Sequence, residues 1–332
     1  MKKNRILQIL AVMLICIFGI TACKKDVGAP EDNAAANVEE TEETDNEYVI
    51  GFSAIDMENP YFITLEESAR EIFSDYEIRV ITKDPGTDPD LQEQQIREMV
   101  EEGIDAIMLT PVDWEKITPS LKVLKDAGVK IINVDTQVKD MDYVDAYIGS
   151  DNTSAGYLCG EDLIERCPKG GKIAILECPT QNSINERITG FEKALSKATN
   201  GFEVVARADT GGEFERALEA AEQIIKENPD IVAIMCGNDQ VAVGAKTAVN
   251  VAGLKDVLIY GADGSPDIKK ELVKTDNQIA GTAAQSPINM GRKAAEITIA
   301  ILTGGDYEKE TYEEVFVINQ NNVDMYGIDG WQ

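Results

Sequence analysis

The sequence predicts an α/β protein built from two doubly wound, parallel-sheet lobes with a ligand cleft between them. Short β-branched runs alternate with segments that carry apolar residues at three- and four-residue spacing. The alternation runs from residue 48 to about 150 and then starts again over a stretch of similar length. A hydrophobic content of 43% supplies enough apolar side chains for two cores. Alternating strands and helices form parallel sheets with helices on both faces, so each stretch predicts one such lobe.

The first stretch is expected to begin with a strand and to alternate after it. Gly103 and Gly128 stand where two helices should end, and Asp113 stands where a helix cap is needed. The predicted strands are Tyr48–Ile55, Ile78–Thr82, Ala106–Thr110, Lys130–Val134 and Tyr143–Ile148. The predicted helices are Tyr61–Phe73, Leu91–Glu101 and Trp114–Ala127.

The second stretch repeats the same alternation. A further helix, Pro287–Leu302, and a strand near Glu314–Ile318 are expected after it. The predicted strands are Lys172–Glu177, Phe202–Arg207, Ile231–Cys236, Val257–Tyr260 and Gln278–Thr282. The predicted helices are Asn152–Arg166, Ser183–Lys197, Glu213–Glu227 and Val241–Val251.

Residues 1–22 have the charged, apolar and small-residue order of a secretory signal. The uncharged run from residue 6 to 20 is shorter than the ~20 apolar residues that a membrane-spanning helix needs. Ile20-Thr21-Ala22-Cys23 resembles the lipobox of bacterial lipoproteins, which implies that Cys23 becomes the lipidated first residue. An ordinary signal with an incidental cysteine is the alternative. The protein is therefore expected outside the cytoplasmic membrane, anchored by lipid at the cell surface or in the periplasm.

The segment that follows Cys23, up to residue 47, is rich in Asp, Glu, Ala, Asn and Thr and has almost no large apolar residues. Such a segment buries too little apolar surface to offset the entropy of ordering it. Residues 23–47 are therefore predicted to be a lipidated cysteine and a disordered acidic tether.

Charge and composition exclude several classes of function. The formal charge of −29 makes nucleic acid and anionic membrane surfaces poor partners, because both require clustered Lys and Arg. The acidity is expected to form a soluble, self-repelling surface; docking of some carboxylates on a basic membrane partner is the alternative. The sequence has no histidine, which excludes Ser-His-Asp and Cys-His catalysis and imidazole zinc sites. We expect no catalytic residues, no metal and no cofactor, and a monomer.

The cysteines of the mature chain are not spaced as a metal or redox motif. Cys159, Cys167, Cys178 and Cys236 are expected to be small buried residues. A disulfide between Cys178 and Cys236 is the alternative, because each ends a strand and the two strands are expected to be neighbours.

Polar and aromatic residues gather at the carboxyl ends of the predicted strands, where doubly wound sheets bind ligands. Aromatic rings pack against the C–H faces of sugars, carboxylates accept hydrogen bonds from hydroxyls, and arginine donates in a fixed fork. Simpler roles remain open: Phe62 as core, Asn59 as a helix cap, Asp263 in a turn and Arg187 in a surface ion pair. The candidate ligand-binding residues are Asn59, Tyr61, Phe62, Asp135, Thr136, Arg187, Phe214, Asn238, Asp263 and Gln285.

Taken together, these residues resemble the ribose-binding branch of the periplasmic sugar-binding proteins, over almost all of residues 48–318. The resemblance implies that the candidates other than Thr136 contact the ligand. Tyr61 stands where ribose binders have phenylalanine, and Thr136 stands where they have arginine, which leaves space for a different ligand. The motifs are Asn59-Pro60-Tyr61-Phe62, Gly149-Ser150-Asp151-Asn152, Gly237-Asn238-Asp239 with Ala242-Val243-Gly244-Ala245, Gly261-Ala262-Asp263-Gly264-Ser265-Pro266 and Ala284-Gln285-Ser286-Pro287.

The resemblance also implies a hinge in which the chain crosses between the lobes near Ser150, Gln285 and Asn319. Residues 48–150 plus 286–318 then form the N-terminal lobe, and residues 151–285 plus 319–332 form the C-terminal lobe. The implied function is capture of a monosaccharide, a pentose or hexose, by lobe closure and its delivery to an ABC permease. Ribose itself is in doubt because of Thr136, and Glu58 makes an amino sugar conceivable.

Three other functions compete with import. A sugar-sensing receptor for a chemoreceptor or sensor kinase would use the same cleft. A glycosidase built on Asp135 and Asp263 is the less favoured alternative. A LacI-type repressor is excluded, because a signal and an acidic tether stand where its helix-turn-helix would be.

Overall fold

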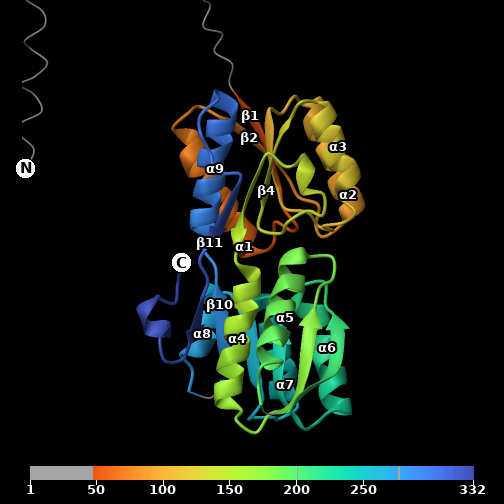
Figure 1. Cartoon of the computed structure of the whole chain (residues 1–332), viewed down its shortest axis with the longest axis vertical. Coiled ribbons are helices and arrows are strands. Elements are labelled where there is room, and N and C mark those ends of the chain that lie inside the picture. The colour runs from red at the N-terminus through yellow and green to blue at the C-terminus, as the bar shows by residue number, and fades with distance from the viewer. Residues whose placement is uncertain (1–47, 200, 276) are drawn as a thin grey trace, which may run out of the picture. The chain divides into compact units, whose positions relative to one another are not determined.

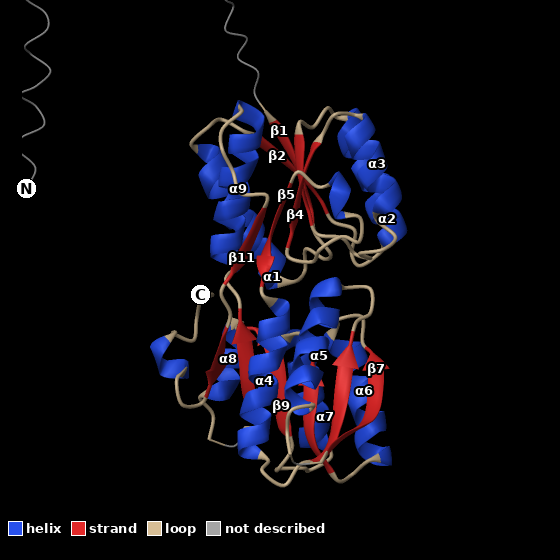
Figure 2. Ribbon diagram, in the orientation of Figure 1, coloured by secondary structure: helices blue, strands red, loops and turns tan. Residues whose placement is uncertain are grey.

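The computed structural model describes residues 48–199, 201–275 and 277–332, which lie within one compact unit. Their strands form two six-stranded sheets, and helices cover both faces of each sheet (Figures 1 and 2). The predicted fold class of two doubly wound, mainly parallel lobes is confirmed. The predictions for the signal, Cys23 and the tether lie outside the described residues. In the described ranges, no helix is both long and apolar enough to span a membrane.

The first sheet has the order β11-β5-β4-β3-β1-β2, and all of its strand pairs are parallel. Its strands are β1 (Val49–Ser53), β2 (Arg79–Lys83), β3 (Ala106–Leu109), β4 (Lys130–Val134), β5 (Ala146–Ser150) and β11 (Glu310–Glu313). Its helices are α1 (Pro60–Ser74), α2 (Pro89–Glu101), α3 (Thr118–Asp126) and α9 (Pro287–Thr303). One face packs against α1 and α9, and the other packs against α2 and α3 (Figure 1).

The second sheet has the order β12-β10-β9-β8-β6-β7, in which only the edge strand β12 runs antiparallel. Its strands are β6 (Gly171–Glu177), β7 (Phe202–Asp209), β8 (Ile231–Cys236), β9 (Leu258–Asp263), β10 (Ile279–Ala284) and β12 (Phe316–Asn319). Its helices are α4 (Asn152–Arg166), α5 (Asn182–Leu195), α6 (Phe214–Glu227), α7 (Asp239–Val251) and α8 (Pro266–Leu272). One face packs against α4 and α5, and the other against α6, α7 and α8.

The chain passes between the lobes after β5, after β10 and between β11 and β12. The third passage differs from the prediction. β12 pairs antiparallel with β10, with Phe316 opposite Ala284, so residues 316–318 belong to the second sheet and the predicted lobe boundary at residue 318 is wrong. Residues 314–318 look like one strand because they are largely apolar, but the strand of the first sheet is the more polar β11 before them.

Three further elements differ locally from their predicted form. Asp113 accepts hydrogen bonds from the backbone N–H groups of Glu115 and Lys116, but α3 begins only at Thr118, next to Pro119, which has no N–H to donate. β5 begins at Ala146 because Met141–Tyr143 forms a 3-10 turn, η1. α8 was not predicted; it is short, and the Ser265 side chain caps it directly before Pro266.

The four cysteines of the described residues are free thiols. Cys159, Cys178 and Cys236 are buried as predicted, and Cys167 is half-buried. The alternative of a disulfide between Cys178 and Cys236 is wrong, because the two side chains belong to cores on opposite faces of the second sheet.

Candidate ligand-binding cleft

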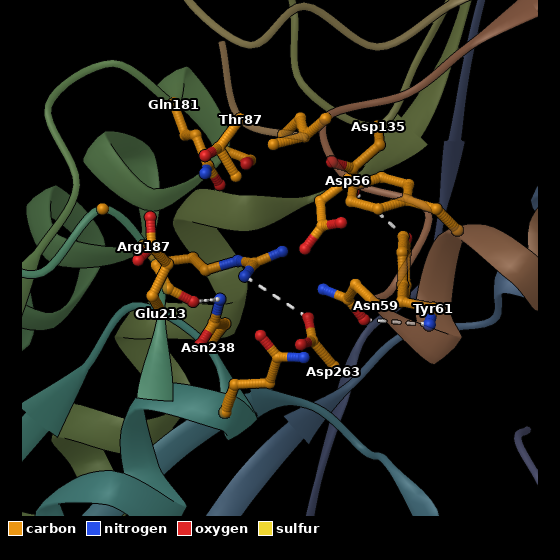
Figure 3. Close-up of a pocket in the computed structure, with 16 residues that line it drawn as sticks. Asp56, Asn59, Tyr61, Thr87, Asp135, Gln181, Arg187, Glu213, Asn238 and Asp263 are labelled. Carbon is orange, nitrogen blue, oxygen red and sulfur yellow. Dashed lines mark hydrogen bonds and ion pairs between the residues drawn. The ribbon is translucent and has the colours of Figure 1, made fainter. Parts of the chain in front are cut away.

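A cavity of about 500 Å³, counting the space at its open side, lies between residues of the two lobes (Figure 3). Seven of the ten candidate residues line it. They are Asn59, Tyr61, Phe62, Asp135, Arg187, Asn238 and Asp263.

The loop after β1 and the start of α1 form the first-lobe wall. The Asn59 side chain accepts a hydrogen bond from the Tyr61 N–H at 3.0 Å and so caps α1, with Pro60 at the first helical turn. Asn59 is therefore both a helix cap and a cavity residue. The Tyr61 and Phe62 rings meet edge to face at 5.3 Å, and both are buried.

Asp135 follows β4 and lines the cavity beside this wall. Its carboxylate accepts hydrogen bonds from the Tyr61 hydroxyl at 3.1 Å and from the Thr136 hydroxyl at 3.2 Å. Burial raises the pKa of Asp135, and the nearby positive charge of Arg187 opposes that rise. Its φ of +65° and the φ of +134° at Asp263 lie where residues other than glycine are rare. Such backbone strain is typical of functional sites, where the surrounding structure holds it in place.

Arg187, on α5, extends into the cavity from the second lobe (Figure 3). Its Nε donates to the Asn152 side chain and its Nη1 donates to the Gly237 carbonyl, each at 2.8 Å. Nη1 also lies 3.5 Å from an oxygen of Asp263. The side chain is only 4% exposed, so the alternative that Arg187 forms a surface ion pair is wrong. These bonds hold the guanidinium in a fixed orientation.

Asp263, at the end of β9, belongs to a buried network. The Gln285 side chain donates to its carboxylate at 2.8 Å, and Gln285 Oε1 has no partner among the described residues although it is buried. Burial raises the pKa of Asp263 to about 6, while Arg187 opposes the shift. Burial and the charge of Asp263 raise the pKa of neighbouring Asp239 to about 7. Asp239 accepts hydrogen bonds from the Thr282 hydroxyl and the Ser265 N–H, each at 2.7 Å.

Asn238 connects the cavity to a loop that the sequence analysis did not identify. Its Oδ1 caps α7 by accepting from the Val241 N–H at 2.9 Å, and its Nδ2 donates to the Gly212 carbonyl at 3.0 Å. Gly211 and Gly212 both have positive φ, which explains why glycines form this part of the wall.

Three candidates do not line this cavity. Phe214 lines the larger hollow beside it. Gln285 stands behind Asp263, as described above. Thr136 is fully buried, and its hydroxyl lies 2.6 Å from that of Ser183, at the start of α5 in the other lobe. The space expected where ribose binders have arginine is thus filled here by a contact between the lobes.

The cavity also contains polar residues that the sequence analysis missed. They come from loops after β1, β2, β6 and β7 and from the first turns of α5 and α7. The Gly86-Thr87 and Gly211-Gly212 pairs were the available sequence signals. They are Asp56, Thr87, Gln181, Ser183, Glu213 and Gln240. With them the wall carries four carboxylates against one arginine. Within residues 48–199, 201–275 and 277–332, no cluster of acidic or cysteine side chains is arranged to hold a metal ion.

Comparisons with known proteins identify the family to which this chain belongs. The family model of the periplasmic binding protein domain matches residues 50–306. The ribose import binding protein of Bacillus subtilis (strain 168) is 27% identical over 299 residues, which cover 90% of this chain and 94% of that protein. A crystal structure of an ABC transporter periplasmic solute binding protein from Actinobacillus succinogenes 130z with bound D-allose has a TM-score of 0.76 and 27% identity, covering 84% of this chain and 100% of that one. The arabinose transporter binding protein from Shewanella sp. ANA-3, bound to L-arabinofuranose, has a TM-score of 0.76 and 26% identity, with coverages of 83% and 93%. The chain belongs to the periplasmic binding protein family.

Proposed function

We propose that this protein binds a monosaccharide, a pentose or hexose, in the cleft and delivers it to an ABC importer. The observation that carries the proposal is the buried Arg187–Asp263–Gln285 network, which borders a cavity that Tyr61 and Phe62 also line. Relatives named as ribose and D-apiose import binding proteins and as a D-allose-binding periplasmic protein support the ligand class. We further propose that the protein works outside the cytoplasmic membrane as a monomer, held by a lipid on Cys23.

The chemistry of the wall suits a ring with several hydroxyls. Each sugar hydroxyl donates and accepts, so a buried one needs a partner of each kind. Asp135 and Asp263 accept, Arg187 donates in a fixed fork, and Asn59 and Asn238 do both. The edge-to-face pair of Tyr61 and Phe62 offers an aromatic surface for the C–H face of the ring.

Contacts from both lobes explain how binding can close the cleft. A ligand that bonds to first-lobe residues such as Asp135 and to second-lobe residues such as Arg187 binds the closed arrangement more tightly than an open one. The chain passages after β5 and β10 and between β11 and β12 are the places where a hinge motion would occur.

Titration calorimetry against D-ribose, D-allose, D-apiose, L-arabinose and D-glucosamine tests the proposal. We expect at least one sugar to bind tighter than about 1 mM, ~−4 kcal/mol. Arg187→Ala should weaken that binding at least about 100-fold, because it leaves Asp263 buried without its cation. The matched control is Arg97→Ala, whose side chain is 50% exposed and pairs with Glu93 on the surface of α2. If no sugar binds at millimolar concentration, or if both variants behave alike, the assignment fails.

The same samples test the enzymatic alternative. We propose that the protein is not an enzyme, so chromogenic glycosides incubated with it should release no aglycone. Hydrolysis that disappears in Asp263→Asn would instead place the protein among the glycosidases.

A further inference from the structure

Three consecutive residues near the end of the described chain contact both lobes. The Gly330 carbonyl accepts a hydrogen bond from Lys269 on α8, in the second lobe. The Gln332 main-chain oxygen accepts one from the hydroxyl of Ser286, the N-cap of α9. Between them, the Trp331 side chain packs against the first-lobe core. Figure 1 shows this end of the chain close to β11, where the chain passes between the lobes.

The second-lobe anchor is a buried cation. Lys269 is fully buried, and an ammonium group out of water is costly unless it is hydrogen-bonded. The bond to Gly330 meets that need. Burial lowers the pKa of Lys269, and Asp239 and Asp329 oppose that shift. The hydrogen bond from buried Lys269 therefore holds Gly330 on α8.

The first-lobe contact of Trp331 reaches the ligand-binding wall. Its ring meets the Tyr61 ring at 5.6 Å with an interplanar angle of 77°, an edge-to-face contact. The Tyr61 hydroxyl in turn donates to the carboxylate of Asp135, the cavity residue whose backbone φ is +65°. Trp331 also lines the larger hollow beside the cavity, together with Asn59 and Phe214. One row of contacts thus runs from the second lobe through Trp331 and Tyr61 to Asp135.

We propose that Trp331 is a positioning residue of the binding site. Its ring fixes Tyr61 so that the tyrosine hydroxyl stays on Asp135. Because Gly330 is held by the second lobe, this support is complete only when the lobes are placed as they are here. The inference rests on the proposed function, in which Tyr61 and Asp135 contact the sugar.

A double-mutant cycle in sugar binding tests it, using whichever of D-ribose, D-allose, D-apiose, L-arabinose and D-glucosamine binds most tightly by calorimetry. Trp331→Ala should weaken binding at least about fivefold, and Trp331→Phe, which keeps an aromatic edge, should stay within about twofold. In a Tyr61→Ala background, Trp331→Ala should cause no further loss. The matched control is Tyr157→Ala, a half-buried tyrosine on α4 whose ring lies 4.5 Å from the Lys197 ammonium, and it should stay within about twofold. Unchanged binding in Trp331→Ala, or equal losses in both backgrounds, overturns the proposal.

A second double-mutant cycle, in thermal stability, needs no ligand. It tests the role of Trp331 independently of the proposed function. Melting temperatures are measured for wild type, Tyr61→Ala, Trp331→Ala and the double variant without sugar. The double variant should lose clearly less than the sum of the two single losses, because the Tyr61–Trp331 contact is removed in both single variants. Additive losses overturn the role of Trp331 even if a sugar binds. Failure of every sugar to bind, together with non-additive melting, contradicts only the function proposed for the cleft.

Discussion

At the scale of single residues, Asp239 shows how burial makes this fold sensitive to pH. Burial, and then repulsion from Asp263, raise the pKa of Asp239 to about 7, and burial raises that of Asp263 to about 6. In an unfolded chain both pKa values return to ~4. Between ~4 and about 7 the folded state therefore binds more protons than the unfolded state, so the stability contribution of these groups falls as pH rises through that window.

The substitution Asp239→Asn should remove most of this loss. An asparagine amide can donate to the Thr282 hydroxyl and accept from the Ser265 N–H, so the local bonds survive without the charge. We expect the variant to match wild type at pH 4.5 and to exceed it at pH 8 by about 1 kcal/mol or more. Urea unfolding at the two pH values measures both quantities. A variant less stable than wild type at pH 8 would show that the carboxylate is needed in its charged form.

The placement of individual residues was predictable where a strand end or helix start fixes them. Asn59 and Asp135 follow strands of the first sheet, and Asn238 and Asp263 follow or end strands of the second, so parallel topology brings each pair to the carboxyl edge of its own sheet. Gln181 was missed because its loop carries no distinctive motif, and Glu213 was missed although the Gly211-Gly212 pair marks its loop. Thr136 was placed on the correct edge, but its contact with Ser183 depends on how the lobes meet, which local patterns do not contain.

At the scale of elements, α4 and α5 pack unusually closely through glycines. A Cβ built on Gly156 would lie 1.7 Å from the Arg187 carbonyl oxygen, and one on Gly190 would lie 1.9 Å from that of Thr153. The two helix backbones are thus in direct contact, and α5 carries Arg187 into the cavity. Helix packing here sets the position of a ligand-binding group.

The substitution Gly156→Ala should therefore damage both stability and binding. The new methyl group collides with backbone that cannot move without shifting Arg187, so we expect destabilisation by at least about 2 kcal/mol. Sugar affinity, measured by calorimetry well below the melting temperature, should fall at least about tenfold. The matched control is Gly305→Ala, where the nearest atom lies at an ordinary 3.5 Å. Lower stability with unchanged affinity would mean that α5 adjusts without moving its arginine.

Elements with strong periodicity were predictable from local sequence, and weakly patterned ones were not. α4 spans the predicted Asn152–Arg166, because its cap and its apolar spacing agree. β11 is a four-residue edge strand of mostly polar residues, which no alternation of apolar residues marks. α8 has only seven residues, too few for a clear helical period.

At the scale of the whole molecule, the order of the passages between the lobes decides which residues meet in the cleft. The third passage depends on the antiparallel pairing of β12 with β10, a contact between segments far apart in sequence. Trp331 meets Tyr61 for the same reason: the chain after β12 returns to the first lobe. Such long-range contacts are decided by tertiary packing, so local propensity in this sequence did not indicate them.

Direct bonds between the lobes beside the cavity should help to hold the closed arrangement. The Thr136 and Ser183 hydroxyls lie 2.6 Å apart and both are buried, while the Trp114 N–H donates to the Thr180 carbonyl at 3.0 Å. Thr136→Val keeps the shape but removes the Thr136 bond to Asp135 and leaves the Ser183 hydroxyl without this partner. The second loss costs about 1–3 kcal/mol in the closed arrangement only. Since binding includes closure, sugar affinity should fall at least about fivefold. Small-angle X-ray scattering with saturating sugar should still report the compact form.

A Ser183→Ala substitution in the Thr136→Val background distinguishes a specific bond from a general disturbance. It removes the unpaired hydroxyl, so the double variant should bind more tightly than Thr136→Val alone. Thr189→Val is the matched control, because that exposed threonine on α5 bonds only to the Asn185 carbonyl of its own helix and should leave affinity within about twofold. Affinities that fall additively in the double variant, or a Thr136→Val protein that binds like wild type, would show that this contact does not stabilise closure. In the first of these outcomes, Thr136 would act on the ligand through its hydrogen bond to Asp135.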